Sequence, residues 1–199
     1  MRHLAVFLYM ASNAAAVERW FDVCPESDAV IHAWARTTVR FDAPCKTVKN
    51  EVLARIAGKN GWVDPHNAGT YELTSSVGDV VAANHLTGDG KYTDKLQFMF
   101  ENADGGDDCE VSGCSVSQVA RGVHKNHALD HSYRFTSAQV TSVIDRSTNY
   151  CNLYNLYCGG NVGCQVAQTD LTAIPLDKKT SLGAGKNKFK CRSGKKREL

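Results

Sequence analysis

The clearest helical pattern in the middle of the chain lies within residues 42–71, which read DAPCKTVKNEVLARIAGKNGWVDPHNAGTY. Its apolar residues recur with helical spacing, because Val48, Val52 and Ile56 follow one another at every fourth position and share one face. Cys45 and Leu53 widen the same stripe. A short amphipathic helix is not stable alone in water, so the pattern predicts a helix that buries this face against another element.

Both ends of this helix carry signals. Asp42 is the predicted N-cap, Pro44 suits a first turn that needs no amide donor, and Gly58 suits the left-handed residue that ends a helix. The polar residues of the helix are predicted to point away from the apolar stripe; they are Lys46, Lys49, Asn50 and Arg55.

Strand signals lie on both sides of the helix. Residues 29–41 alternate between apolar and polar side chains, which is typical of a half-buried strand. Turn residues follow the helix, and further strands are predicted at 70–74, 80–87 and 92–101. Their short connections favour an antiparallel meander that forms the surface for the helix. The later chain is predicted to hold a strand at 140–145, a disulfide-pinned turn or short helix at 150–164, and an edge strand within 165–175.

These elements predict an α+β fold in which one amphipathic helix packs on an antiparallel sheet of four to six strands. The order of strand, helix and meander resembles the cystatin-like arrangement, and this likeness concerns the fold alone. A cystatin inhibitor needs a Q-x-V-x-G hairpin, whereas residues 118–122 read Gln-Val-Ala-Arg-Gly, with Ala at the position of the Val. Protease inhibition is therefore not predicted. The alternative architecture is a β-sandwich with the helix at its edge.

The first residues predict export. Residues 4–10 form an apolar run, residues 11–16 are mostly small, and cleavage is expected after Ala16, so residues 1–16 are interpreted as a signal peptide. The alternative is an N-terminal strand or helix of the fold. No other apolar run approaches the roughly 20 residues that span a bilayer, and no transmembrane segment is predicted.

The cysteines agree with this compartment. Their even number and the absence of any C-x-x-C pair favour disulfides over a structural zinc site and predict a disulfide-braced domain. The last four residues, 196–199, read KREL and resemble the KDEL retrieval signal with Arg in place of Asp. The protein is therefore expected to be secreted, or to stay in the endoplasmic reticulum lumen if that signal is read. The eight cysteines are Cys24, Cys45, Cys109, Cys114, Cys151, Cys158, Cys164 and Cys191.

The predicted organisation is a signal peptide, a single α+β domain at 17–176 and a disordered basic tail at 177–199. Residues 178–199 carry nine Lys or Arg and one Glu, whereas residues 1–177 carry 14 basic and 20 acidic residues. Such a tail is predicted to contact an acidic surface, or merely to keep the protein in solution. Phe189 is its one aromatic residue, which argues against sequence-specific nucleic-acid binding. Residues 120–139 are interpreted as a possible insertion, because similar residues flank them.

Two clusters suggest metal binding, although no cofactor is predicted. Three histidines with helical spacing are weak zinc candidates, and acidic residues in a glycine-containing loop are weak calcium candidates. Neither cluster has the spacing of an established metal motif, and solvated loops explain both. The histidines are His124, His127 and His131, and the loop acids are Asp104, Asp107 and Asp108.

The weak catalytic candidates are Asp64 and His66 in the loop after the helix, where Trp62 and Tyr71 are expected to form an aromatic wall. No G-x-S-x-G nucleophile motif accompanies them. The leading functional hypothesis is a non-enzymatic, secreted or lumenal, disulfide-rich binding protein of unknown ligand. The alternative is a small secreted hydrolase that uses Asp64 and His66, so the sequence favours a non-enzymatic role without deciding the matter.

Overall fold

The structure is a computed structural model, and it describes residues 24–26, 32–103, 106–118 and 145–192. Several expectations lie outside these ranges. They are the signal peptide, the insertion at 120–139, all but the last residue of the strand at 140–145, the candidate ligands His124, His127, His131 and Asp104, and the KREL tetrapeptide.

Among the described residues, six strands form one antiparallel sheet. Each neighbouring pair is antiparallel, and the spatial order is β2-β3-β4-β5-β1-β6. The meander expected after the first helix is therefore confirmed, and β1 joins its far side. The strands are β1 (Trp34–Phe41), β2 (Thr70–Val77), β3 (Val80–Leu86), β4 (Thr93–Asn102), β5 (Cys109–Ser117) and β6 (Ile174–Thr180).

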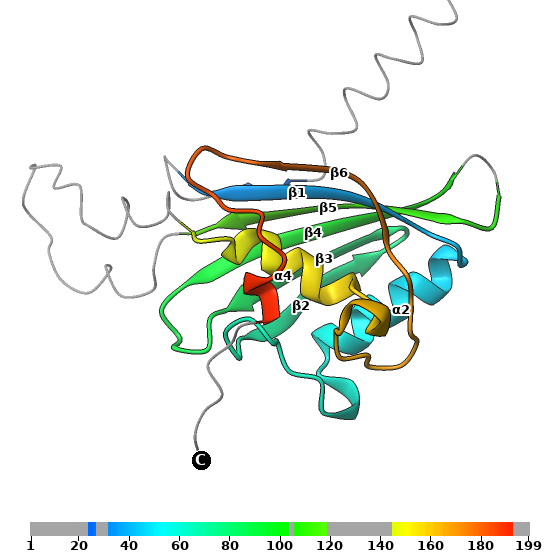
Figure 1. Cartoon of the computed structure of the whole chain (residues 1–199), viewed down its shortest axis with the longest axis horizontal. Coiled ribbons are helices and arrows are strands. Elements are labelled where there is room, and N and C mark those ends of the chain that lie inside the picture. Colours follow the sequence, from blue (N-terminus) through cyan, green and yellow to red (C-terminus); the bar gives the residue numbers. More distant parts are fainter. Residues whose placement is uncertain (1–23, 27–31, 104–105, 119–144, 193–199) are drawn as a thin grey trace, which may run out of the picture.

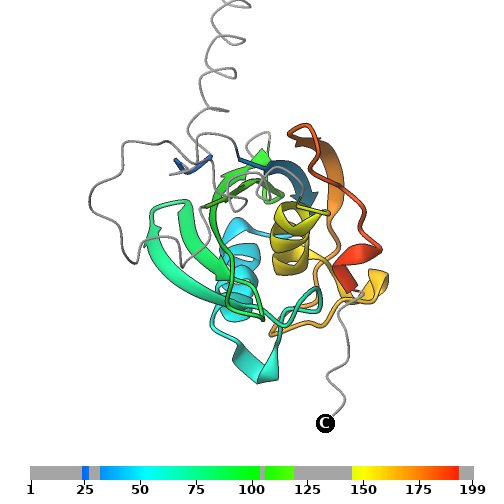
Figure 2. The same cartoon turned by 90° about the vertical axis from the view of Figure 1, so that its left-hand side faces the viewer.

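The described part of the chain places helices α2 (Cys45–Ile56) and α4 (Thr148–Tyr157) on one face of the sheet, as Figures 1 and 2 show. Short 3-10 turns occur at Lys59–Gly61 (η1), Gly160–Val162 (η3) and Lys190–Arg192 (η4). The α+β class is confirmed. The cystatin-like arrangement is not, because a second helix shares the covered face. All the described strands belong to a single sheet, so the sandwich alternative is not seen either.

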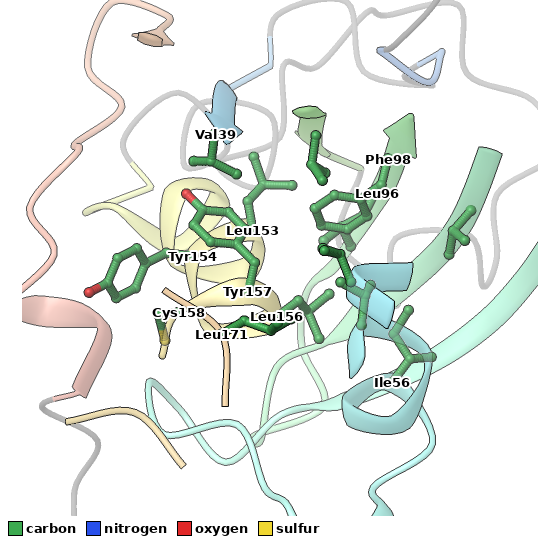
Figure 3. Packing of buried hydrophobic residues seen from close by; sticks show 14 of the residues in the cluster. Val39, Ile56, Leu96, Phe98, Leu153, Tyr154, Leu156, Tyr157, Cys158 and Leu171 are labelled. Carbon is green, nitrogen blue, oxygen red and sulfur yellow. The ribbon is translucent and has the colours of Figure 1, made fainter. Parts of the chain in front are cut away.

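The core lies between the helices and the sheet. Val48, Val52 and Ile56 are buried, as the helical stripe predicts. Figure 3 shows apolar side chains of α4, among them Leu153, gathered beside Phe98 of the sheet. Each fully buried side chain of this size contributes about 1.5–3 kcal/mol, so this interface is the main source of stability.

The helix ends only partly follow the prediction. Gly58 has a φ of +63°, as expected of the residue that ends a helix. The predicted cap at Asp42 is wrong, because the N-cap is Pro44 and no side chain caps it. Arg55, which was expected to point away from the stripe, is fully buried because α4 covers that side of α2.

Strand β5 lies near the centre of the sheet but has no apolar alternation in sequence. Gly113 occupies the helix-facing side, directly opposite Phe98 in the register. A Cβ atom there would lie 2.9 Å from the Phe98 ring and 3.3 Å from Leu153. Glycine thus creates the space into which α4 packs, which is why the usual pattern of a buried strand is missing.

All eight cysteines form disulfides, as predicted. Two bonds brace the sheet, Cys24–Cys114 and Cys45–Cys109, and the second ties α2 to β5. The other two hold α4 and the chain after it, Cys151–Cys191 and Cys158–Cys164. Within the described ranges no helix is long and apolar enough to cross a membrane.

The chain after residue 176 differs from the expected disordered tail. Residues 177–180 belong to β6, which pairs with β1, and Cys191 is bonded to α4. The predicted edge strand within 165–175 is displaced accordingly to Ile174–Thr180. The sequence pattern is misleading here because an edge strand and a disulfide-anchored loop need no apolar periodicity.

Candidate functional site

The two catalytic candidates do not bring their side chains together. Asp64 is buried, and its Oδ1 accepts the backbone N–H of His66 at 3.1 Å. The imidazole of His66 turns elsewhere, with its Nδ1 2.8 Å from the carbonyl oxygen of Lys190. The hydrolase therefore stays a prediction that this geometry does not support.

Asp64 instead meets His85, a residue that the sequence did not single out. His85 Nε2 lies 3.2 Å from Asp64 Oδ2, and His85 Nδ1 lies 3.8 Å from Asp94 Oδ2. The exposed fractions of Asp64, His85 and Asp94 are 2%, 0% and 2%. One imidazole thus lies between two carboxylates in the interior of the protein.

Three asparagines lie on the face of α4 that is turned toward this cluster, and two of them bond to it. Asn149, Asn152 and Asn155 follow one another at every third position, so they share one face of the helix, and all three are buried. Asn152 Nδ2 donates to Asp94 Oδ2 at 2.7 Å, and Asn155 Nδ2 donates to Asp64 Oδ1 at 2.8 Å. The N-x-x-N-x-x-N spacing is visible in the sequence and could have predicted a polar face on this helix.

The first of these asparagines ties the start of α4 to β5. Asn149 Oδ1 accepts from Ser115 Oγ at 2.8 Å, and its Nδ2 donates to Ser117 Oγ at 2.8 Å. The carboxylate of Asp145 accepts the backbone N–H groups of Ser147 and Asn149. Acidic groups at a helix start satisfy free amides and favour the helix dipole, so Asp145 helps to begin α4.

Aromatic rings seal the other side of the cluster. The Tyr71 ring lies 4.6 Å from the His85 ring and 5.8 Å from the Trp62 ring, measured between centroids. The Tyr71 hydroxyl donates to the carbonyl oxygen of Asn152 at 3.1 Å. The aromatic pair predicted from the sequence is therefore present, and it covers a buried imidazole.

The electrostatics of the cluster favour an ion pair. Burial acts to lower the pKa of His85, but hydrogen bonds and charges from Asp64 and Asp94 outweigh it and raise that pKa. Burial acts to raise the pKa of Asp64, but His85, the His66 amide and Asn155 outweigh it and lower that pKa. Burial raises the pKa of the Tyr71 hydroxyl, so this group stays neutral.

A second buried ion pair joins α2 to the chain after α4. Arg55 Nε donates to Glu51 Oε1 at 2.8 Å. The Glu51 carboxylate also accepts three backbone N–H groups, from Ala167, Gln168 and Thr169, at 2.7–2.8 Å. Burial acts to raise the pKa of Glu51, but these donors outweigh it and lower that pKa. This pair holds residues 167–169 in place.

Both buried networks consist of groups that bond to the protein itself. An acid or base acts on a substrate only if it reaches the substrate directly or through one water molecule. His85 and Asp64 are enclosed by α4, the aromatic rings and the sheet, so their geometry fits the joining of elements.

For metal binding, the described ranges contain no group of three potential His, Cys, Asp or Glu ligands. Asp107 and Asp108 are described, and their predicted partner Asp104 is not.

A charged surface stands out on the segment that was expected to be disordered. We call residues 178–192 the basic segment; it carries six Lys or Arg and no Asp or Glu. Lys178, Lys186 and Lys188 are exposed. Two large apolar side chains lie among them, Leu182 with 95% of its surface exposed and Phe189 with 69%.

The body of the protein holds this segment at several points. The Gly185 amide donates to Asp145 Oδ1 at 3.2 Å, and the Asn187 amide donates to Ser147 Oγ at 3.3 Å. Asn155 Nδ2 donates to the carbonyl oxygen of Cys191 at 3.1 Å. The cations and apolar side chains are therefore presented from a fixed frame.

Comparison of the chain with protein-family models, with curated proteins and with solved structures finds no match. Its class therefore follows from its own fold and covalent bonds. It is a small α+β protein with four disulfides. Disulfides in a chain of this size fit a secreted or lumenal protein.

Proposed function

We propose that the protein is a non-enzymatic binding protein of the secreted or lumenal compartment and that its basic segment contacts an acidic protein surface. The observation that carries the proposal is the joint exposure of Lys186, Lys188 and Phe189 on a segment anchored by the Cys151–Cys191 disulfide. Cations supply charge complementarity, and exposed apolar side chains supply contact area.

Anchoring supports binding because it reduces the entropy that association costs. A flexible tail loses side-chain and backbone freedom when it binds, at about 0.5–1.5 kcal/mol per ordered side chain. The bonds of Gly185 and Asn187 to the start of α4 hold this segment before any partner arrives. The surface is thus organised in advance.

The apolar side chains favour a protein partner over a simple polyanion. A polyanion such as heparin pairs with cations but offers no apolar surface to Leu182 or Phe189. An acidic protein surface offers both, and exposed apolar residues among polar ones mark protein contact sites. The compartment itself is supported by the four disulfides.

Binding to immobilised synthetic polymers tests the proposal. We expect the protein to bind a random copolymer of glutamate and tyrosine more tightly than polyglutamate, heparin or anionic phospholipid vesicles. The triple substitution K178Q/K186Q/K188Q should weaken binding to the copolymer by about tenfold, because each lost ion contact contributes a few tenths of a kcal/mol or more. The pair L182S/F189S should remove the preference for the copolymer over polyglutamate.

The matched control is K46Q/K59Q/K91Q, which removes the same charge from exposed positions elsewhere on the protein. It should leave copolymer binding nearly unchanged. If both triple variants weaken binding equally, the attraction depends on net charge alone and the proposed surface is wrong. Tighter binding to heparin or to vesicles than to the copolymer would reject a protein partner.

A further inference from the structure

One disulfide, Cys24–Cys114, lies on the face of the sheet opposite the helices. Gly113 faces α4, and alternation along a strand turns its neighbour Cys114 to the other side. Cys114 is buried in a small cluster apart from the main core, whereas Cys24 is half-buried. Cys24 is therefore the more exposed of the two bonded cysteines.

A guanidinium group lies directly against the bond. Arg36 Nε points at Cys24 Sγ with a separation of 2.8 Å. Arg36 is also the direct neighbour of Cys114 across the β1–β5 pair. Because the two sulfurs are bonded to each other, the positive charge lies beside both.

The position of this charge is restrained. The guanidinium carbon of Arg36 lies 5.1 Å from the centre of the Trp34 ring, which is close enough for a cation–π contact. Gln97, the neighbour of Cys114 on the opposite strand, is uncharged. Arg36 is the charged side chain whose described contacts include this disulfide, while Lys95 donates to the carbonyl oxygen of Glu26 and Lys179 lies opposite Arg36 on β6.

We propose that Cys24–Cys114 is a thiol–disulfide exchange site for small thiols of the glutathione class, and that Arg36 promotes the exchange. The inference is independent of the proposed binding surface, because the lysines and apolar side chains proposed to bind the partner, Lys178, Lys186, Lys188, Leu182 and Phe189, are not used in it. A cation beside a disulfide attracts the incoming thiolate and stabilises the thiolate that leaves.

The exchange balances in two steps. The sulfur of an incoming thiolate bonds to Cys24 Sγ, the Cys24–Cys114 bond breaks, and its electron pair leaves on Cys114 Sγ as a thiolate beside Arg36. A second thiolate then bonds to the sulfur of the first thiol, which releases a small-molecule disulfide and the Cys24 thiolate. Two small thiols are oxidised and one protein disulfide is reduced.

The Cys45–Cys109 bond provides an internal comparison. It also pairs a half-buried cysteine with a fully buried one. Glu110 follows Cys109, but alternation along β5 turns its side chain to the opposite face of the sheet. The described contacts place no Lys or Arg side chain against this bond as Arg36 lies against Cys24–Cys114, so this bond should exchange more slowly although its accessibility is similar.

The test is reduction of the native protein by reduced glutathione, followed by differential alkylation and mass spectrometry of each cysteine. We expect Cys24–Cys114 to be reduced about tenfold faster than Cys45–Cys109, and we expect added salt to narrow this difference. If Cys24–Cys114 is not the faster of the two, the proposal fails.

Substitutions of Arg36 separate a chemical role from a structural one. R36Q should slow the reduction of Cys24–Cys114 by about tenfold and leave Cys45–Cys109 unchanged, and R36K should keep most of the rate. A side chain that only stabilises the fold would have the opposite effect, because loosening the sheet exposes the bond and speeds its reduction. An unchanged or faster rate in R36Q would overturn the proposal.

Discussion

The Nε2 atom of His85 lies 3.2 Å from the Oδ2 atom of Asp64, and both side chains are shielded from solvent. Asp64 belongs to the loop after η1 and His85 belongs to β3, so the contact joins two elements that are distant in sequence. Buried charges are tolerated when they are paired and hydrogen-bonded, and Asn155 supplies the further bond that Asp64 needs.

Removing one partner of this pair should destabilise the protein strongly. D64N keeps the size of the side chain but removes its charge, and we expect the free energy of unfolding to fall by about 3 kcal/mol because His85 loses its partner. Urea denaturation followed by tryptophan fluorescence measures this. D79N, at an exposed turn, is the control and should stay within about 0.5 kcal/mol of the wild type. A loss of similar size in both variants would show that the buried Asp64–His85 pair contributes no more to stability than an exposed aspartate does.

The same contact should make stability depend on pH. The raised pKa of His85 contributes stability that is fully present below about pH 6.5, the unfolded value, and is lost as the pH rises through the folded pKa. The lowered pKa values of Asp64 and Glu51 contribute stability that is present above about pH 4 and is lost as the pH falls. Stability should therefore be greatest between about pH 4 and pH 6.5.

Urea midpoints measured across this range check the pH prediction. H85Q should flatten the alkaline side of the profile, because the titrating group is gone. H66Q serves as the control, since His66 is partly exposed and lies outside the ion pair. If H85Q retains the alkaline slope of the wild type, another group causes it.

Glu51 should control the order of the chain at residues 167–169. In E51A, three backbone N–H groups lose their acceptor and Arg55 loses its partner, so we expect a loss of about 3–5 kcal/mol. Hydrogen exchange of these three amides should become faster than that of the β3 amides. E72A, on an exposed position of β2, should change neither quantity, and protected amides in E51A would contradict this role.

The two disulfides of the α4 region should differ in their contribution. Cys151 and Cys191 are separated by 40 positions, whereas Cys158 and Cys164 are separated by six. Loop-closure entropy predicts a loss of about 4 kcal/mol for C151A/C191A and about 2 kcal/mol for C158A/C164A. Guanidinium denaturation of each double variant tests the order, and the reverse order would show that packing outweighs chain entropy.

Gly113 should be the glycine of β5 that tolerates no side chain. G113A places a methyl group against the Phe98 ring and Leu153, and we expect a loss of about 1–3 kcal/mol from overpacking. G106A is a suitable control, because its Cβ would make only an ordinary contact at 3.5 Å. Thermal unfolding of both variants measures the difference, and equal melting temperatures would contradict close packing of α4 on β5.

The sequence predicted those elements whose signal is local. Val48, Val52 and Ile56 specify the buried face of α2 by spacing alone, and Gly58 ends the helix as expected. That all eight cysteines form disulfides also followed from their even number and spacing, although their connectivity did not. Arg55 shows the limit of this reasoning, since whether a polar residue on the flank of a helix is buried depends on a second helix from far along the chain.

The candidate site was predicted only in part. Asp64 was singled out with the wrong partner, because His66 is close in sequence while His85 is close in space. The sequence does not predict the three buried asparagines of α4, because asparagine usually marks loops and its burial requires partners supplied by the sheet. The basic segment is ordered, although its sequence predicts disorder. Its order comes from pairing with β1 and from the disulfide to Cys151, and neither leaves a local signal in the sequence.

The fold class, the main amphipathic helix and the use of every cysteine in a disulfide could be read from the sequence alone. These depend on residue type and on spacings of a few positions, which local geometry converts directly into structure. The connectivity of the cysteines, the histidine that contacts Asp64 and the attachment of the basic segment to α4 could be read only from the folded chain. Each of these depends on contacts between residues distant in the chain, and such contacts exist only once the sheet has brought them together.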